Sequence, residues 1–420
     1  MPTSHIDPSA ARAFAVEVVK ELRYQGYESL WAGGCVRDQL LNRVPTDYDV
    51  ATSAPPDSVR KIFGNRRTIA VGAAFGVITV IGSKASGNVE VATYRSDAEY
   101  IDGRHPVGVT FCDAREDALR RDFTINGLFF DPVKGVVVDY VGGQQDLEKG
   151  IIRAIGDPDM RFGEDHLRML RAVRFSANFG FPLESQTRNA IERLSKQLEL
   201  VSPERLAAEL RLMVSREGRG QALRLLAATG LVHPLFGDQI DKTEAFWASA
   251  SDVLDKIHEP SLPVAMAILC RGDIEAVVGM GNHLRLSNSE KKLASWLVKA
   301  LSVLSSKNFL PDYSGVPWSL LQPWLAHEWR FHLADLMVAL SIIDYFPSEN
   351  VEWVSNQVQR DDSELNPSHL LGGKDLLNIG VPAGPLVGHL LTQLRALQLD
   401  EKVTSREAAI KWVEQQCVND

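Results

Sequence analysis

Hydrophobic positions in the first third of the chain follow helical spacing in some segments and strand spacing in others. Apolar side chains recur every three to four residues over 11–25, which predicts an opening amphipathic helix. Short apolar or alternating runs at 76–81, 89–94 and 135–139 predict strands. From about residue 158 onward helical spacing dominates, with prolines between the segments. The pattern therefore predicts an α/β head followed by a long all-α part.

The length of the chain indicates more than one domain. A chain of 420 residues exceeds what a single hydrophobic core organises. We expect a head over residues 1–150, a helical neck over 151–215, a helical body over 216–330 and a helical tail over 331–420.

Composition narrows the class of protein. A chain that is 45% hydrophobic and 24% charged is typical of a globular protein. It has no apolar stretch of about 18 residues and no leader-like N-terminus, so we expect no membrane partner. Its four cysteines are far apart and form no Cys-x-x-Cys, which excludes a zinc ribbon. We expect a cytoplasmic protein without a disulfide-linked partner.

Residues 45–50 contain two aspartates, Asp47 and Asp49, that are one residue apart. On a strand both carboxylates would project from one side, while Tyr48 and Val50 would enter an apolar layer. Such a pair repels itself unless a proton or a cation lies between the carboxylates. Mg²⁺ is the cation that one or two carboxylates and substrate phosphates typically hold. The alternative is a solvated turn, because aspartate is common in turns.

A glycine pair, Gly33 and Gly34, lies shortly before these aspartates. It separates a short apolar run from a segment with helical spacing. Strand, glycines and helix start in this order let backbone N–H groups face an anion without a Cβ in the way. Arg37 adds a guanidinium at the same end. A tight turn is the alternative for an isolated glycine pair, but the aspartates nearby favour a phosphate-binding loop.

These motifs together resemble a known family. Gly-Gly-Cys-Val-Arg-Asp at 33–38, followed by Asp-Tyr-Asp at 47–49, is similar to the signature of the class II tRNA nucleotidyltransferase and bacterial poly(A) polymerase superfamily. Segments at 372–375 and 381–385 resemble the tail of bacterial CCA-adding enzymes. Four further segments resemble the family's motifs in the same order: 120–126, 139–146, 164–175 and 202–209.

The resemblance implies a polymerase-β-like nucleotidyltransferase head followed by all-α neck, body and tail, with base recognition in the neck and tRNA binding in the tail. It implies an enzyme that adds C and A nucleotides to the 3′ end of tRNA from CTP and ATP without a template. Asp47 and Asp49 would be the catalytic Mg²⁺ ligands, by two-metal phosphoryl transfer. The expected nucleotide-binding residues are Gly34, Arg37, Arg121, Asp165, Arg168, Arg171 and Arg174.

Asp165 and Arg168 offer a way to select the base. Segment 164–175 predicts one helix that carries both residues. An ionised aspartate only accepts hydrogen bonds and an arginine only donates them, which matches the pairing edges of cytosine and adenine. Uracil and guanine reverse the order and would leave buried polar groups unsatisfied. The alternative is a solvated helix face with an ion pair between the two residues.

Several alternatives stay open at this point. The net charge of −9 disfavours an RNA partner, although arginines concentrated in one region can form a local basic cleft. Other functions within the superfamily are addition of only A or only CC, and poly(A) polymerisation. From another class, an inactive RNA- or nucleotide-binding scaffold is the alternative.

Further predictions concern four features near the expected site. Glu90 is either a third metal carboxylate or part of a cross-strand pair. Arg120 is expected to form an ion pair with Asp117 or Asp122, which is also the alternative for Arg121. Asp139 and Asp146 are expected to shape a turn. The segment Asp102–Arg104 lies in a loop that the family associates with the switch from adding C to adding A.

Overall fold

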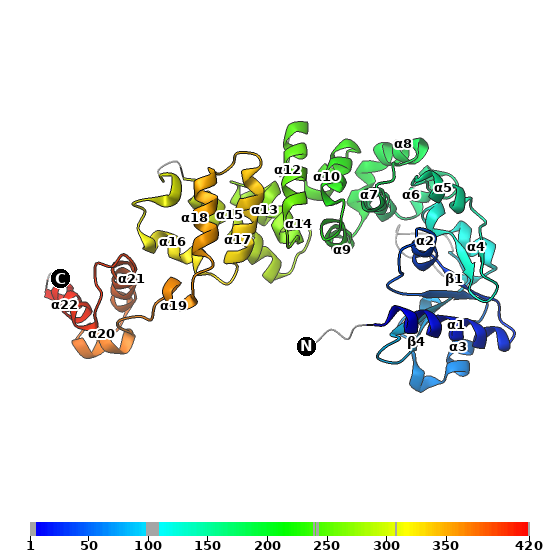
Figure 1. Cartoon of the computed structure of the whole chain (residues 1–420), viewed down its shortest axis with the longest axis horizontal. Helices are drawn as coiled ribbons and strands as arrows, with labels where there is room; N and C mark the ends of the chain where they lie inside the picture. The colour runs from blue at the N-terminus through cyan, green and yellow to red at the C-terminus, as the bar shows by residue number, and fades with distance from the viewer. Residues whose placement is uncertain (1–5, 98–108, 238–239, 241–242, 307–308, 419–420) are drawn as a thin grey trace. The chain divides into compact units, whose positions relative to one another are not determined.

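The chain consists of two compact units, Met1–Asp238 and Gln239–Asp420. Figure 1 traces the elements of both units in chain order. All strands of the described residues belong to the first unit, and the described elements of the second unit are helices. The computed structural model describes residues 6–97, 109–237, 240, 243–306 and 309–418.

In the described residues seven strands form one mixed sheet in the order β3-β4-β5-β2-β1-β8-β9. At its centre β2 (Asp49–Thr52) is parallel to β5 (Asn88–Thr93) and antiparallel to β1 (Ser29–Ala32). The three strands predicted from 76–81, 89–94 and 135–139 are confirmed as β4, β5 and β9. The outer strands are β3 (Thr68–Ile69), β4 (Val77–Ile81), β8 (Phe129–Asp131) and β9 (Val136–Val138).

Helix α1 (Pro8–Tyr24) packs on the central strands of this sheet. The predicted opening helix is therefore confirmed, but it begins earlier than residue 11. Asp7 accepts a hydrogen bond from the Ser9 N–H, and Pro8 occupies the first helical turn, where its missing N–H carries no penalty. The apolar face of α1 buries Phe14, Val18 and Leu22, as the sequence pattern predicts.

The other elements of the sheet region are short. A separate two-stranded sheet joins β6 (Arg95–Asp97) and β7 (Val109–Phe111). The predicted loop at Asp102–Arg104 lies between these strands and outside the described residues. The helices are α2 (Gly34–Leu40), α3 (Pro56–Phe63), α4 (Ala114–Leu119) and α5 (Gly143–Lys149).

Helices complete the first unit, and one prediction about them is wrong. Segment 164–175 is not one helix, because α6 ends at Glu164 and α7 begins at Leu167. Asp165 is extended and its carboxylate accepts the Leu167 N–H, so it competes with the helical hydrogen bonds. These helices are α6 (Pro158–Glu164), α7 (Leu167–Phe179), α8 (Ser185–Leu194), α9 (Pro203–Val214), α10 (Arg219–Ala228) and α11 (Val232–Phe236).

The second unit is built on α13, whose residues are all buried and which packs against α15. None of the helices in the described part of the chain has the length and apolar character needed to cross a membrane. The helices are α12 (Glu244–Lys256), α13 (Leu262–Leu269), α14 (Ile274–His283), α15 (Asn288–Leu304), α16 (Trp318–Leu325), α17 (Arg330–Ser341), α18 (Ser348–Gln357), α19 (Asp362–Leu365), α20 (Gly373–Ile379), α21 (Pro385–Leu399) and α22 (Arg406–Val418).

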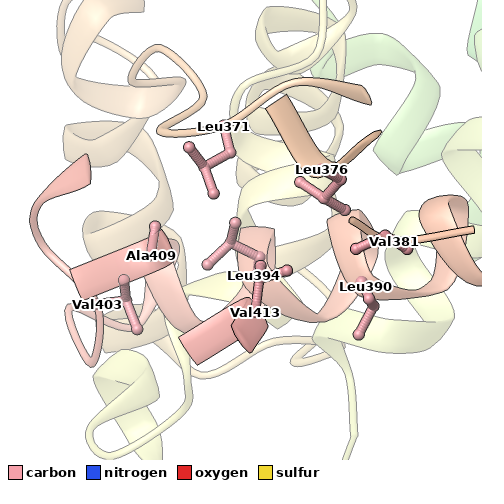
Figure 2. Packing of buried hydrophobic residues seen from close by; sticks show 8 residues of the cluster. All are labelled: Leu371, Leu376, Val381, Leu390, Leu394, Val403, Ala409 and Val413. Atoms are coloured by element: carbon pink, nitrogen blue, oxygen red, sulfur yellow. The ribbon is translucent and has the colours of Figure 1, made fainter. Parts of the chain in front are cut away.

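The last three helices share a small hydrophobic cluster of their own, shown in Figure 2. Its side chains come from α20, α21, α22, the loops between them and the segment just before α20. Small apolar clusters are sensitive to truncation because few neighbours compensate for lost contacts. The buried members are Leu371, Leu376, Val381, Leu390, Leu394, Val403, Ala409 and Val413.

Replacing Leu394 by alanine tests how much this cluster contributes to the free energy of unfolding. The side chain is 2% exposed, so its truncation leaves a cavity that lowers the free energy of unfolding by about 2–5 kcal/mol. Leu377→Ala is the matched control, because Leu377 is 47% exposed in the neighbouring helix. Chemical denaturation of the full chain, followed by circular dichroism, measures both variants. Equal losses in the two variants would contradict the assigned packing.

Candidate active site

The aspartate pair lies where the chain enters β2. The strand begins at Asp49, so the prediction that Asp47 is also in the strand is wrong. Asp47 belongs to a bend in which the Thr46 hydroxyl donates to its carboxylate over 3.2 Å. The alternation of side chains holds, because Tyr48 and Val50 are buried while both carboxylates reach solvent. The Tyr48 ring packs 4.7 Å from the Trp31 ring and fixes the bend to the core.

A cleft of about 520 Å³ opens above this pair. It brings together groups from the start of β2, from the start of α2, from the segment after α4 and from α7. Several of its lining residues have no predicted role, among them Asn126 and Arg216. All residues predicted for catalysis and nucleotide binding line it: Gly34, Arg37, Asp47, Asp49, Arg121, Asp165, Arg168, Arg171 and Arg174.

Negative charge is concentrated at the floor of the cleft. Desolvation raises the pKa of Asp49 to about 6, with further contributions from the charges of Asp47 and Glu90, while Arg121 opposes the shift. Glu90 lies on β5 directly beside Asp49 in the parallel register. Even so, the described residues contain no group of three or more His, Cys, Asp or Glu side chains arranged to hold a metal ion. The site is therefore a pair of aspartates with a nearby glutamate.

The glycine pair adopts the geometry of a tight strand-to-helix turn. Gly33 has φ 70°, and a Cβ added there would lie 3.1 Å from Nη1 of Arg121. Glycine is favoured at this position because its backbone conformation strains other residues and the arginine approaches closely. Gly34 then begins α2, which carries Arg37. Arg37 is buried and donates to the Asn126 side-chain oxygen over 2.6 Å and to Asp38 over 2.9 Å.

Asp117 organises the two arginines that follow α4. This carboxylate is 1% exposed and pairs with Arg120 at 2.7 Å and with Arg121 at 2.9 Å. Burial alone would raise its pKa, but the two guanidinium groups hold the pKa of Asp117 below its usual range. The expected ion pair of Arg120 is confirmed. Arg121 shares the same partner and also lies over the Phe129 ring, with its guanidinium carbon 5.0 Å from the ring centroid.

Asp165 and Arg168 line the cleft without pairing with each other. Asp165 accepts from Arg205 over 2.8 Å. Arg168 is buried and donates to Glu164 over 2.5 Å and to the carbonyl oxygens of Arg161 and Arg120. The alternative of an ion pair between the two residues is therefore wrong. Each side chain is held by another partner, Arg168 by Glu164 and Asp165 by Arg205. Both partners lie in the sequence motifs, but the motifs did not indicate these pairs.

The remaining two arginines of α7 are each matched by a buried carboxylate. Arg171 pairs with Asp122 at 2.6 Å. Although burial opposes it, the charge of Arg171 and the neighbouring hydrogen bonds lower the pKa of Asp122 to about 2. Arg174 pairs with Glu209, and both side chains are buried. These pairs hold the guanidinium groups in place along one wall of the cleft.

Asp139 shapes the turn before α5, as expected, whereas Asp146 lies within α5 and does not shape a turn. Asp139 accepts hydrogen bonds from four consecutive backbone N–H groups, those of residues 141–144. Asp146 is buried and accepts from the Thr124 hydroxyl and from Arg153. Neither residue lines the cleft.

Comparison with known proteins decides the family. The model of the poly A polymerase head domain matches residues 30–153, and that of the probable RNA and SrmB-binding site of polymerase A matches residues 180–242. The CCA-adding enzyme of Lactobacillus johnsonii is 33% identical over 400 residues, which cover 94% of this chain and 95% of the relative. The chain belongs to the CCA-adding enzyme family.

Other members agree with this assignment. The CCA-adding enzyme of Bacillus pumilus is 32% identical over 422 residues, or 97% of this chain and 98% of the relative. The crystal structure of the Bacillus stearothermophilus CCA-adding enzyme in complex with CTP matches with a TM-score of 0.76 and 26% identity, over 96% of this chain and 97% of that chain. The expected nucleotidyltransferase head and helical domains are confirmed. Nucleotidyltransferases of this type are generally metal-dependent.

The raised pKa of Asp49 predicts how stability depends on pH. The folded-state pKa of Asp49 is about 6, which is above the unfolded value. The folded protein therefore loses stability as the pH rises from the unfolded pKa to the folded pKa. Without divalent cations, Asp49→Asn should therefore melt at a higher temperature than the wild type at about pH 7.5. The difference should vanish below about pH 4, where the carboxylate is protonated in both states.

Thermal melts in EDTA across this pH range measure the effect. Asp57→Asn is the matched control, since Asp57 is an exposed aspartate on α3 outside the cleft. If Asp49→Asn melts at a lower temperature than the wild type at about pH 7.5, the assigned destabilisation of the ionised Asp49 by desolvation and neighbouring charge is wrong.

Proposed function

We propose that this CCA-adding family member extends the 3′ end of tRNA with C and A nucleotides from CTP and ATP, without a template. The observation that carries the proposal is the shared cleft. It is lined by the aspartate pair, the glycine turn with Arg37, and the Asp165 and Arg168 side chains. A nucleotide that spans these groups would place its phosphates near the aspartates and its base on the neck helices.

In this proposal Asp47 and Asp49 hold Mg²⁺ at the floor of the cleft. Their oxygen atoms are the ligands that Mg²⁺ prefers. Desolvation and the neighbouring charges of Asp47 and Glu90 raise the pKa of Asp49, and a bound cation would offset both effects. Bound Mg²⁺ supplies activation of the RNA 3′-hydroxyl and neutralisation of charge on the leaving pyrophosphate. Gly34 and Arg37 hold the triphosphate, and Arg121 contacts a phosphate or the ribose. Positioning by these groups is the main requirement of phosphoryl transfer.

We propose that Asp165 and Arg168 read the base, while Arg171 and Arg174 contact the rest of the nucleotide. The separate partners of Asp165 and Arg168 support this role, because each side chain is oriented before a nucleotide arrives. A preorganised site loses less side-chain entropy on binding. The carboxylate then accepts from the exocyclic amine of cytosine or adenine, and the guanidinium donates to the ring nitrogen.

Each part of the chain has its own role in this proposal. We propose catalysis in residues 1–150, base recognition in 151–215, and tRNA binding by the body (216–330) and tail (331–420). Similarity to CCA-adding relatives over nearly the whole chain favours CCA addition over poly(A) polymerisation. A scaffold without activity would have no use for two mutually repelling carboxylates. We assign the reaction to the cytoplasm, where the expected tRNA substrate is found. All four cysteines are free thiols, as is typical of proteins in that reducing compartment.

Removing one aspartate tests the catalytic proposal. The wild type, mixed with Mg²⁺, CTP, ATP and tRNA that lacks its last three nucleotides, should restore the complete 3′ end. Asp47→Ala should lower the rate roughly a thousandfold, because metal stabilisation of the transition state is worth several kcal/mol. Product length on a sequencing gel measures both. Asp57→Ala is the control, and addition at the wild-type rate in Asp47→Ala would remove the metal proposal.

Replacing both base-reading residues tests selectivity. In Asp165→Asn/Arg168→Gln each amide can donate as well as accept, so UTP and GTP no longer meet unmatched groups. The ratio of kcat/KM for CTP to that for UTP should fall about tenfold or more. Asp159→Asn/Arg193→Gln, which breaks an exposed ion pair outside the cleft, is the matched control. An unchanged ratio in the first variant would exclude this mode of base selection.

A further inference from the structure

Three of the arginines expected to bind the nucleotide are connected through one residue, Asn126. Its side-chain oxygen accepts a hydrogen bond from Nη1 of Arg37 over 2.6 Å, and its backbone oxygen accepts from Nη1 of Arg121 over 3.4 Å. Its side-chain nitrogen donates to Asp122 over 3.1 Å, and the other oxygen of Asp122 pairs with Arg171 at 2.6 Å. All five residues line the nucleotide cleft. Asn126 therefore joins the side of the cleft formed by α2 to the side formed by α7.

The chemistry of the two side-chain partners fixes the direction of the Asn126 amide. A guanidinium group only donates hydrogen bonds, so the amide oxygen must face Arg37. Burial opposes the shift, but the charge of Arg171 and hydrogen bonds that include the one from Asn126 lower the pKa of Asp122 to about 2. The ionised carboxylate only accepts, so the amide nitrogen must face Asp122. Leucine and aspartate have a similar size, but neither can serve both partners.

The backbone holds Asn126 in place independently of these arginines. Asn126 ends the short 3₁₀ helix η3 (Thr124–Asn126), which packs on α2. Its N–H donates to the Phe123 carbonyl oxygen over 2.9 Å, and the residue is only 8% exposed. A residue that is fixed in this way can determine where its partners lie.

The hydrogen bonds of Asn126 give direction to arginines whose charge is already balanced. Arg37 pairs with Asp38 at 2.8 Å, and Arg171 pairs with Asp122, so neither needs a neutral amide as a counter-charge. The amide instead connects the two ion pairs and limits how far one can move relative to the other. Buried hydrogen-bond networks whose members are satisfied make the groups that they include more rigid.

We propose that Asn126 is a positioning residue that holds Arg37 and Arg171 at a fixed separation, so that both guanidinium groups bind the same nucleotide. The inference rests on the proposed function, in which Arg37 holds the triphosphate and Arg171 contacts the rest of the nucleotide. Donors that are fixed beforehand lose less freedom on binding. CTP and ATP share their triphosphate and ribose, so Asn126 acts on both alike and leaves the choice of base to Asp165 and Arg168.

The test uses the full chain with Asn126→Leu, which removes both side-chain hydrogen bonds at similar size. The KM for CTP and the KM for ATP should each rise roughly tenfold, while kcat falls by less than about threefold. The ratio of kcat/KM for CTP to that for UTP should stay within about twofold of the wild type. Calorimetric titration with CTP and Mg²⁺ in the absence of RNA gives the affinity independently of turnover. Asn126→Ser is a milder second variant, because its hydroxyl is too short to reach both partners and the KM should again rise.

A double-mutant cycle tests the connection itself. If Asn126 acts by linking the two arginines, Asn126→Leu/Arg171→Gln should raise the KM for CTP no more than the more severe of the two single changes. If the residues act independently, the two effects multiply. Asn350→Leu is the matched control, because Asn350 is 5% exposed and lies on α18 outside the cleft. The control should keep the KM for CTP of the wild type.

Three results would overturn the inference. They are an unchanged affinity for CTP in folded Asn126→Leu, a loss of kcat at unchanged KM, and effects that multiply in the double variant. A changed ratio of CTP to UTP would assign Asn126 to base selection and also overturn it. Failure of the proposed function shows separately, as absence of nucleotide addition by the wild type.

Discussion

Electrostatic repulsion at the start of β2 is the constraint on which the rest of the site depends. Asp47 and Asp49 present their carboxylates to one cleft, and the parallel register places Glu90 beside them. Desolvation first, and then the charges of Asp47 and Glu90, raise the pKa of Asp49 to about 6. The sheet nevertheless fixes this arrangement, because Tyr48 and Val50 anchor the same segment in the core. The carboxylates are thereby held close together, and a divalent cation bound between them would reduce their repulsion.

The arginines of the cleft show how an acidic protein can bind polyanions. Most of them are paired with buried or half-buried carboxylates, so they add little net charge to the cleft. Asp117, Asp122, Glu164 and Glu209 are these partners. The net charge of −9 therefore describes the whole chain and says little about the cleft.

Periodicity and motif order predicted the elements well. Helices and strands with one buried face have apolar residues at regular spacing, and this spacing is visible in the sequence. The errors fall at polar boundaries. Asp165 interrupts its helix, because its carboxylate competes for the local Leu167 N–H. Asp47 lies in a bend before its strand, where its carboxylate accepts from the Thr46 hydroxyl. The Glu164 partner of Arg168 is local, because it lies four residues away. The Arg205 partner of Asp165 was not predictable, because it comes from another helix.

The most direct test of the account is the binding of Mn²⁺, as a spectroscopic substitute for Mg²⁺, to the full chain in the presence of a non-hydrolysable CTP analogue. Electron paramagnetic resonance counts the free and bound ions. The account predicts saturable binding by the wild type and its loss in the Asp47→Asn/Asp49→Asn variant, with the fold intact. Equal stoichiometry and affinity in the two proteins would contradict the claim that these aspartates form the metal site.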